Sequence, residues 1–127
     1  VSLIGEGVFQ QFPTLRMAVL DIGFAWLPSL LWRLDKEWKG LRRTVPWIDR
    51  PASAIVRDHM RFSTAPLDAG PIDEMVRMLE WAGEDVVMFG SDYPRNHDDD
   101  IGAFLGALSP EVRGKVLSQN ARAFYSL

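Results

Sequence analysis

The carboxylate of Asp92 is the side chain of this sequence best placed to do chemistry. It follows a short apolar run, residues 86–90, that is rich in Val and Phe and ends in a turn-forming segment, residues 91–94. Such a run predicts a strand that is buried on both faces, as in a parallel sheet. Because chemistry in parallel α/β sheets takes place at the carboxyl ends of the strands, the pattern predicts a functional role for Asp92. The alternative is that Asp92 only caps a turn or the following helix.

The two histidines differ in their expected roles. His97 lies in a polar loop five residues after Asp92. From there it could reach the same site as a proton-transfer or substrate-binding residue, although a histidine in an acidic loop can also be simply solvated. His59 precedes an expected strand, at the amino end of the sheet, where residues serve stability, so we expect it to be structural.

Composition limits the classes of protein to which the chain can belong. Its 127 residues favour a single domain over residues 1–127. A net charge of −3 argues against nucleic-acid binding, and no apolar run approaches the roughly 18 residues that a membrane span needs. The absence of Cys excludes disulfides and thiolate metal sites. We expect a cytoplasmic location. Since the chain starts without Met, we expect either a processed chain or a sequence that begins inside a longer reading frame.

The elements that must position these residues alternate along the chain. Buried strands are predicted at residues 15–20, 61–64 and 86–90. Helices are predicted from apolar spacing and from the Pro and Gly residues at their ends, over residues 2–12, 27–42, 52–59, 71–83, 101–108 and from 109 onward. This alternation predicts an α/β protein with a parallel sheet. Three strands are too few for a closed barrel, which has eight in the usual form.

Four segments carry a resemblance to a known family. They are residues 12–16 (FPTLR), 26–35 (WLPSLLWRLD), 89–94 (FGSDYP) and 120–125 (NARAFY). In this order they resemble the C-terminal half of the amidohydrolase-related family of metal-dependent barrel enzymes. That family includes aminocarboxymuconate-semialdehyde decarboxylase and related aromatic-acid decarboxylases. The resemblance implies a partial (β/α)₈ TIM barrel comprising approximately the last three βα units.

The resemblance also implies roles for individual residues. Asp92 falls at the position of the family's eighth-strand Asp, which binds a divalent metal, expected to be Zn²⁺, or accepts a proton from metal-bound water. Asp21 lies near the place of a histidine that many members carry on the sixth strand, and is expected to be a second acidic group at the same site. The family's remaining histidine ligands belong to strands that this sequence does not contain.

The resulting hypothesis is the C-terminal part of a metal-dependent hydrolase or decarboxylase that acts on a small organic acid or amide and is inactive in isolation. It implies a small-molecule substrate and a missing N-terminal half or a homo-oligomer. One alternative is a non-catalytic partial barrel that completes its sheet by oligomerisation or against a partner chain. Another is a small flavodoxin-like domain, which the absence of a Gly-rich phosphate loop disfavours.

Overall fold

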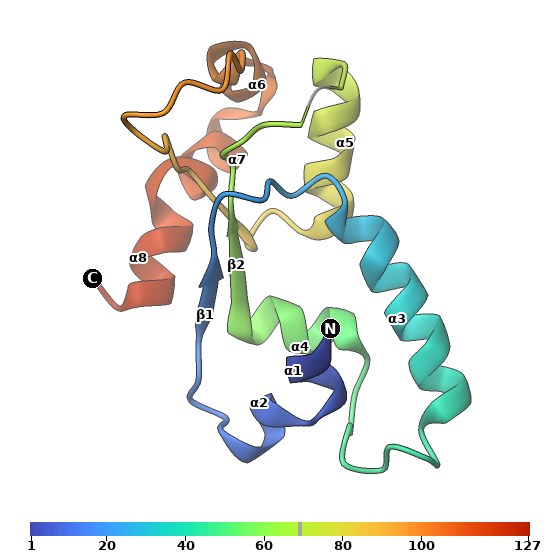
Figure 1. Cartoon of the computed structure of the whole chain (residues 1–127). Helices are drawn as coiled ribbons and strands as arrows, with labels where there is room; N and C mark the ends of the chain where they lie inside the picture. The colour runs from blue at the N-terminus through green and yellow to red at the C-terminus, as the bar shows by residue number, and fades with distance from the viewer. Residues whose placement is uncertain (69) are drawn as a thin grey trace.

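A three-stranded parallel sheet forms the centre of the chain. The computed structural model describes residues 1–68 and 70–127, and its strands are β1 (Met17–Val19), β2 (Met60–Ser63) and β3 (Val87–Met88). They lie in the order β1-β2-β3, so neighbours in sequence are neighbours in the sheet (Figure 1). Met17 of β1 is opposite Met60, and Phe62 of β2 is opposite Val87. This confirms the predicted α/β class and the parallel pairing of all three strands.

Helices precede, connect and follow the strands. Before β1 come α1 (Ser2–Gly5) and α2 (Val8–Gln11); α3 (Leu27–Leu41) and α4 (Ala52–His59) separate β1 from β2; and α5 (Ile72–Ala82) separates β2 from β3. After β3 come α6 (Ile101–Ala107), α7 (Pro110–Gly114), a π-helical segment η1 (Lys115–Gln119) and α8 (Asn120–Tyr125). No helix in the described parts of the chain is long and apolar enough to span a bilayer.

The two faces of the sheet are covered by different helices. Alternate side chains of a strand point to opposite faces. Phe62, which is 1% exposed, packs in the main apolar cluster with Leu27 and Leu31 of α3. On the other face, the guanidinium of Arg61 lies over the ring of Phe124 in α8, and desolvation by burial lowers the pKa of that arginine. Figure 1 shows α3 and α8 on opposite sides of the strands.

The predicted helix over residues 2–12 is wrong in one respect, because it is broken into α1 and α2. Gly7 interrupts it with a left-handed backbone, φ 69°. The indole of Trp47 fills the space beside it, and a Cβ at position 7 would lie 2.7 Å from Trp47 Cδ1. The indole N–H also donates a hydrogen bond to the Gly5 carbonyl, 2.9 Å. A contact from residue 47 therefore accompanies the break.

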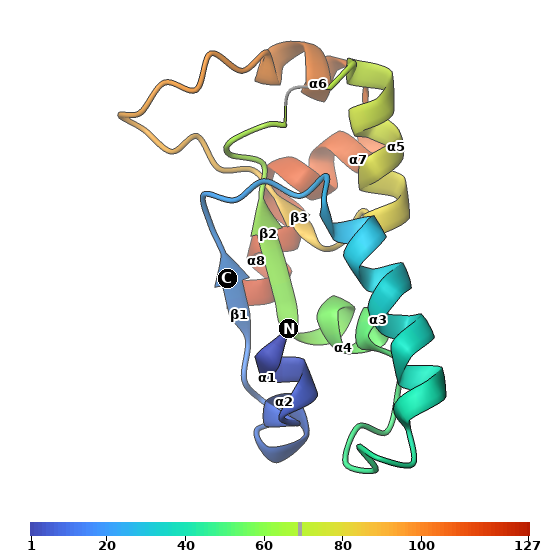
Figure 2. The same cartoon turned by 45° about the vertical axis from the view of Figure 1, so that its right-hand side comes forward.

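The order of the strands also disagrees with the flavodoxin-like alternative. That fold places its first strand between the second and the third. Here β2 lies between β1 and β3, as in a sheet whose units follow one another around a barrel. In Figure 2, the loops that follow the strands lie in the upper part of the molecule, and residues 90–100 reach away from the sheet.

Candidate functional site

Asp21 and Asp92 lie at the carboxyl ends of the two outer strands. Asp21 follows β1, and Asp92 follows β3 after a short extension. Both have left-handed backbone conformations, with φ 61° at Asp21 and φ 51° at Asp92. Short polar residues adopt this conformation more readily than other non-glycine residues, which suits them to sharp turns at strand ends. The structure therefore supports the strand-end placement predicted for both carboxylates.

Two buried hydroxyls at the end of β2 hold the loops of its neighbours. The Ser63 hydroxyl accepts the backbone N–H of Asp21, 3.3 Å, and donates to the Ala65 carbonyl, 2.9 Å. The Thr64 hydroxyl accepts the N–H of Gly90, 3.1 Å, and donates to the Gly90 carbonyl, 3.2 Å. The central strand thus connects the loop that bears Asp21 with the segment that leads to Asp92.

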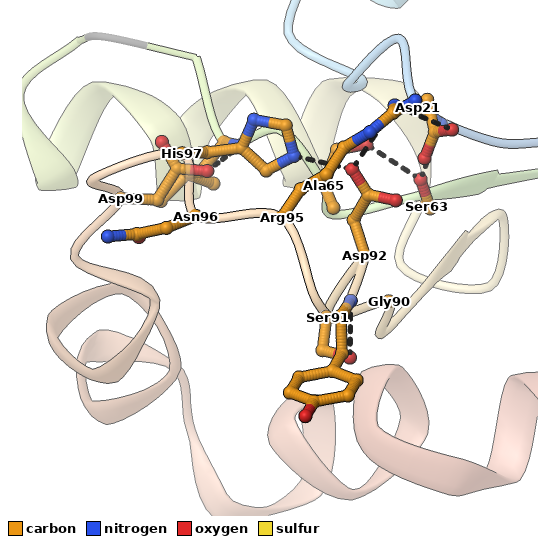
Figure 3. A network of polar contacts seen from close by, with 12 residues as sticks. Asp21, Ser63, Ala65, Gly90, Ser91, Asp92, Arg95, Asn96, His97 and Asp99 are labelled. Atoms are coloured by element: carbon orange, nitrogen blue, oxygen red, sulfur yellow. Dashed lines mark hydrogen bonds and ion pairs between the residues drawn. The ribbon is translucent and has the colours of Figure 1, made fainter.

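Asp92 is the centre of a small polar network (Figure 3). Its Oδ2 lies 2.7 Å from His97 Nε2, and its side chain is only 16% exposed. The guanidinium of Arg95 lies between the two acidic groups, with Nη1 at 3.7 Å from Asp92 Oδ2 and at 3.8 Å from Asp21 Oδ2. The structure therefore brings together Asp92, Asp21 and His97, the three predicted site residues, with Arg95 among them.

The other acidic residues of the loop have structural partners. Asp99 accepts the backbone N–H of Leu67, 2.6 Å, which attaches the loop to the segment after β2. Asp100 caps α6 by accepting the N–H of Ala103, 2.9 Å. Capping of this kind satisfies a helix donor that would otherwise lack a partner. These contacts give Asp99 and Asp100 structural roles, the second of them at the start of a helix.

A cavity of about 140 Å³ lies beside the network. Its polar wall includes Arg95, Asn96 and His97, and its apolar wall includes Phe89 and Ile101. A space of this size holds a ligand of one ring or a few carbon atoms. The lining can present the imidazole of His97, which is hydrogen-bonded to Asp92, and the guanidinium of Arg95 to one small molecule.

The described residues do not by themselves make a metal site. Across residues 1–68 and 70–127, no group of three or more His, Asp or Glu side chains is placed to hold an ion. Asp21 and Asp92 could each donate oxygen, but Arg95 lies between them, and a cation would have to compete with it. Any metal bound here therefore needs further ligands from outside these residues.

His59 lies far from this network, at the amino end of β2. Its side chain is 7% exposed, stacks on Phe9 with ring centroids 4.7 Å apart, and has Nδ1 2.9 Å from the Leu15 carbonyl. Buried histidines with satisfied ring nitrogens serve packing, and the geometry supports the structural role expected from the sequence.

Sequence reasoning missed three residues of the site: Arg95, Ser63 and Thr64. A signal for Arg95 was available, since it stands three residues after Asp92 and two before His97. Ser63 and Thr64 were recognised only as part of a strand. Their contacts join segments 26 and 42 residues apart, and depend on which strand lies next to which.

Comparisons with known proteins agree on the family. The model of the amidohydrolase family matches residues 1–127 of the chain. A search of curated proteins found no match.

Several solved structures share the fold. One is 2,6-dihydroxybenzoate decarboxylase from Rhizobium, with 21% identity, a TM-score of 0.73, and coverage of 98% of this chain and 38% of that one. Another is 5-carboxyvanillate decarboxylase from Novosphingobium aromaticivorans, complexed with manganese and a nitrobenzoic acid, with 23% identity, a TM-score of 0.74, and coverage of 98% and 37%. A third is an amidohydrolase from Mycobacterium avium subsp. paratuberculosis, with 20% identity, a TM-score of 0.76, and coverage of 97% and 31%.

The chain thus spans less than two fifths of the length of these proteins. Identities this low show a shared fold only, whereas the family match extends over every residue. The chain belongs to the amidohydrolase family.

Proposed function

We propose that this chain is the last three strand–helix units of a (β/α)₈ barrel whose complete form is a metal-dependent decarboxylase or hydrolase of a small organic acid or amide. The observation that carries the proposal is the Asp92–His97 pair at the carboxyl end of β3, 2.7 Å apart and close to Asp21. In barrels of this kind, catalytic residues come from the ends of several strands. The sequential strand order and the partial coverage of longer relatives support the same reading.

We assign Asp92 as one ligand of a divalent cation or as a proton acceptor beside it. Its low exposure keeps the carboxylate oriented, and the contact with His97 fixes one of its oxygens. His97 would hold that oxygen, and the carboxylate would in turn orient the imidazole and favour its charged form, as carboxylate–imidazole pairs do. Asp21, which is 49% exposed, would add negative charge that attracts a cation to the same site.

The proposed cation would be bound by the complete barrel, because the described residues of this chain supply too few metal ligands. One structurally similar decarboxylase is complexed with manganese, whereas the resemblance to the family implies zinc. A divalent cation polarises a bound oxygen and so stabilises negative charge. Either ion fits a carboxylate ligand, and the choice between them depends on the ligands that the rest of the barrel supplies. The cytoplasmic location likewise stays a prediction.

The role of Asp92 can be tested on the chain itself with paramagnetic Mn²⁺. Bound Mn²⁺ broadens the NMR signals of nearby amides, so even weak binding can be located. We expect broadening at Gly90, Ser91 and Asn96, loss of that broadening in Asp92→Asn, and no stoichiometric metal after gel filtration. Glu80→Gln, a change at an exposed carboxylate on α5, is the matched control.

Two results would contradict the proposal. Broadening that survives Asp92→Asn, or that is no stronger near Asp92 than near Glu80, would remove Asp92 as a ligand. Stoichiometric, tightly held metal with turnover of 2,6-dihydroxybenzoate by the chain alone would show that the site needs no other segment.

A second candidate is favoured by the outer edge of β1. Within the described residues, β1 pairs with β2 only. An open edge presents unpaired N–H and C=O groups to other chains. The chain would then be a non-catalytic partial barrel that covers this edge with a second copy or a partner.

A further inference from the structure

Arg95 lies beside two carboxylates but makes no close hydrogen bond with either of them. Its guanidinium is 3.7 Å from Asp92 and 3.8 Å from Asp21, and the side chain is 69% exposed. Hydrogen bonds between arginine and a carboxylate are shorter, about 2.7–2.9 Å. The guanidinium is therefore held near two carboxylates by charge, while its N–H donors remain available on the open side.

The cavity beside Arg95 has both apolar and polar lining, as an amphipathic acid would require. Phe89 and Ile101 form apolar wall, and Arg95, Asn96 and Asp99 form polar wall, with the Asp99 carboxylate already engaged by a backbone N–H. A ring or short alkyl group of a ligand could lie against the first wall. Its charged group would then meet the second, where a planar guanidinium matches the two oxygens of a carboxylate.

We propose that Arg95 is a specificity-determining residue that binds the carboxylate of an anionic substrate at this site. The inference rests on the proposed function, since it takes the cavity as the substrate site, and it adds the group that selects acids over neutral amides. The two acidic neighbours keep Arg95 at the cavity without occupying its donors in short hydrogen bonds. Binding a substrate carboxylate would weaken these two ion pairs at a modest cost in free energy, because both contacts are long and partly solvated.

The test compares an acid with its neutral analogue in the absence of metal. Benzoate and benzamide have the same ring and differ in charge. Each is titrated into the full chain and followed by the NMR shifts of Gly90 and Asn96. We expect benzoate to bind more tightly than benzamide, and Arg95→Gln to weaken benzoate binding about 10-fold or more, in line with loss of a charged hydrogen bond.

The controls separate a bidentate contact from a general effect of charge. Arg33→Gln removes the same charge from an exposed helical ion pair and should leave benzoate binding unchanged. Arg95→Lys keeps the charge but loses the planar fork, so it should restore affinity only in part. Circular dichroism of each variant checks that the fold is retained.

Three outcomes would overturn the inference: no benzoate binding by the unmodified chain, equal affinity in Arg95→Gln, or full recovery in Arg95→Lys. These outcomes are distinct from failure of the proposed function. The metal-free titration does not depend on a cation, whereas the Mn²⁺ experiment depends on Asp92 and not on the ligand.

Discussion

At the scale of single residues, the acidic side chains owe their positions to neighbours from another strand. Asp21 and Asp92 lie in left-handed turns after β1 and β3. Between them, the buried hydroxyls of Ser63 and Thr64 bond to the backbone of the flanking loops. Groups at the end of a strand therefore position a carboxylate that lies on a loop. This holds the carboxylate more rigidly than the loop alone would.

Thr64→Val tests this positioning. Valine has nearly the shape of threonine, but it would leave the N–H and C=O of Gly90 without their side-chain partner. Thr64 is 1% exposed, so these groups would lose a hydrogen-bond partner that is shielded from solvent. We expect the free energy of unfolding to fall by about 1–3 kcal/mol, measured with urea.

The matched control is Thr14→Val, at an exposed threonine before β1. We expect it to change the free energy of unfolding by less than about 0.5 kcal/mol. An equal change in both variants would mean that the Thr64 hydroxyl contributes no more to stability than an exposed one, and would contradict its positioning role.

The contacts of the site were predictable only where they are local in sequence. His97 is five residues from Asp92, and its reach to that carboxylate could be anticipated from the loop. The approach of Asp21 to Arg95 joins segments 74 residues apart, and nothing in either segment indicates the other. Such contacts follow from strand order and register, which local patterns do not determine.

At the scale of elements, helices were predicted more closely than strands. The helix expected over residues 27–42 occupies Leu27–Leu41, with proline in its first turn as predicted. The strand expected over residues 86–90 is reduced to Val87–Met88. Helical spacing repeats over many residues, whereas a strand exists only as far as its neighbour pairs with it. The break at Gly7 is accompanied by a contact from Trp47, which is distant in sequence, so the glycine itself is its only local signal.

The junction between α7 and η1 gives a pH-dependent prediction. Lys115 Nζ lies 3.1 Å from Glu84, 3.6 Å from Asp85 and 3.9 Å from Glu111. The hydrogen bond with Glu84, with added attraction from Asp85, raises the pKa of Lys115 above its ordinary value of 10.5. A pKa that is raised on folding stabilises the folded state below the ordinary value, and the contribution disappears as the pH rises through the folded-state pKa.

Lys115→Met should therefore lower the urea midpoint at neutral pH, and its difference from the unmodified chain should shrink as the pH rises above about 10.5. The exposed Lys36, changed to methionine, serves as control and should show a smaller difference at neutral pH. A difference for Lys115→Met that is constant with pH would assign the effect to packing and not to charge.

At the scale of the whole molecule, the chain is much shorter than the structures that share its fold. It spans 31–38% of the three structures compared. The β3 side is partly covered, because the Phe89 N–H donates to the Val116 carbonyl of η1, 2.8 Å. On the β1 side, no strand of the described residues pairs with the outer edge of β1, and an apolar cavity of about 230 Å³ lies between β1, β2 and α3. Leu20, the residue directly after β1, is exposed. The β1 side is thus the less covered of the two.

An apolar, unpaired edge predicts that the isolated chain self-associates as its concentration rises. Size-exclusion chromatography with light scattering should give a mass above that of one chain, falling towards the monomer on dilution. Leu20→Lys places a charge at this edge, where Leu20 is 57% exposed, and should shift the equilibrium to monomer. Leu117→Lys changes an exposed leucine on η1 and should leave it unchanged. A chain that stays monomeric at high concentration would show that the edge of β1 needs no cover, and would remove the main support for completion by a second copy.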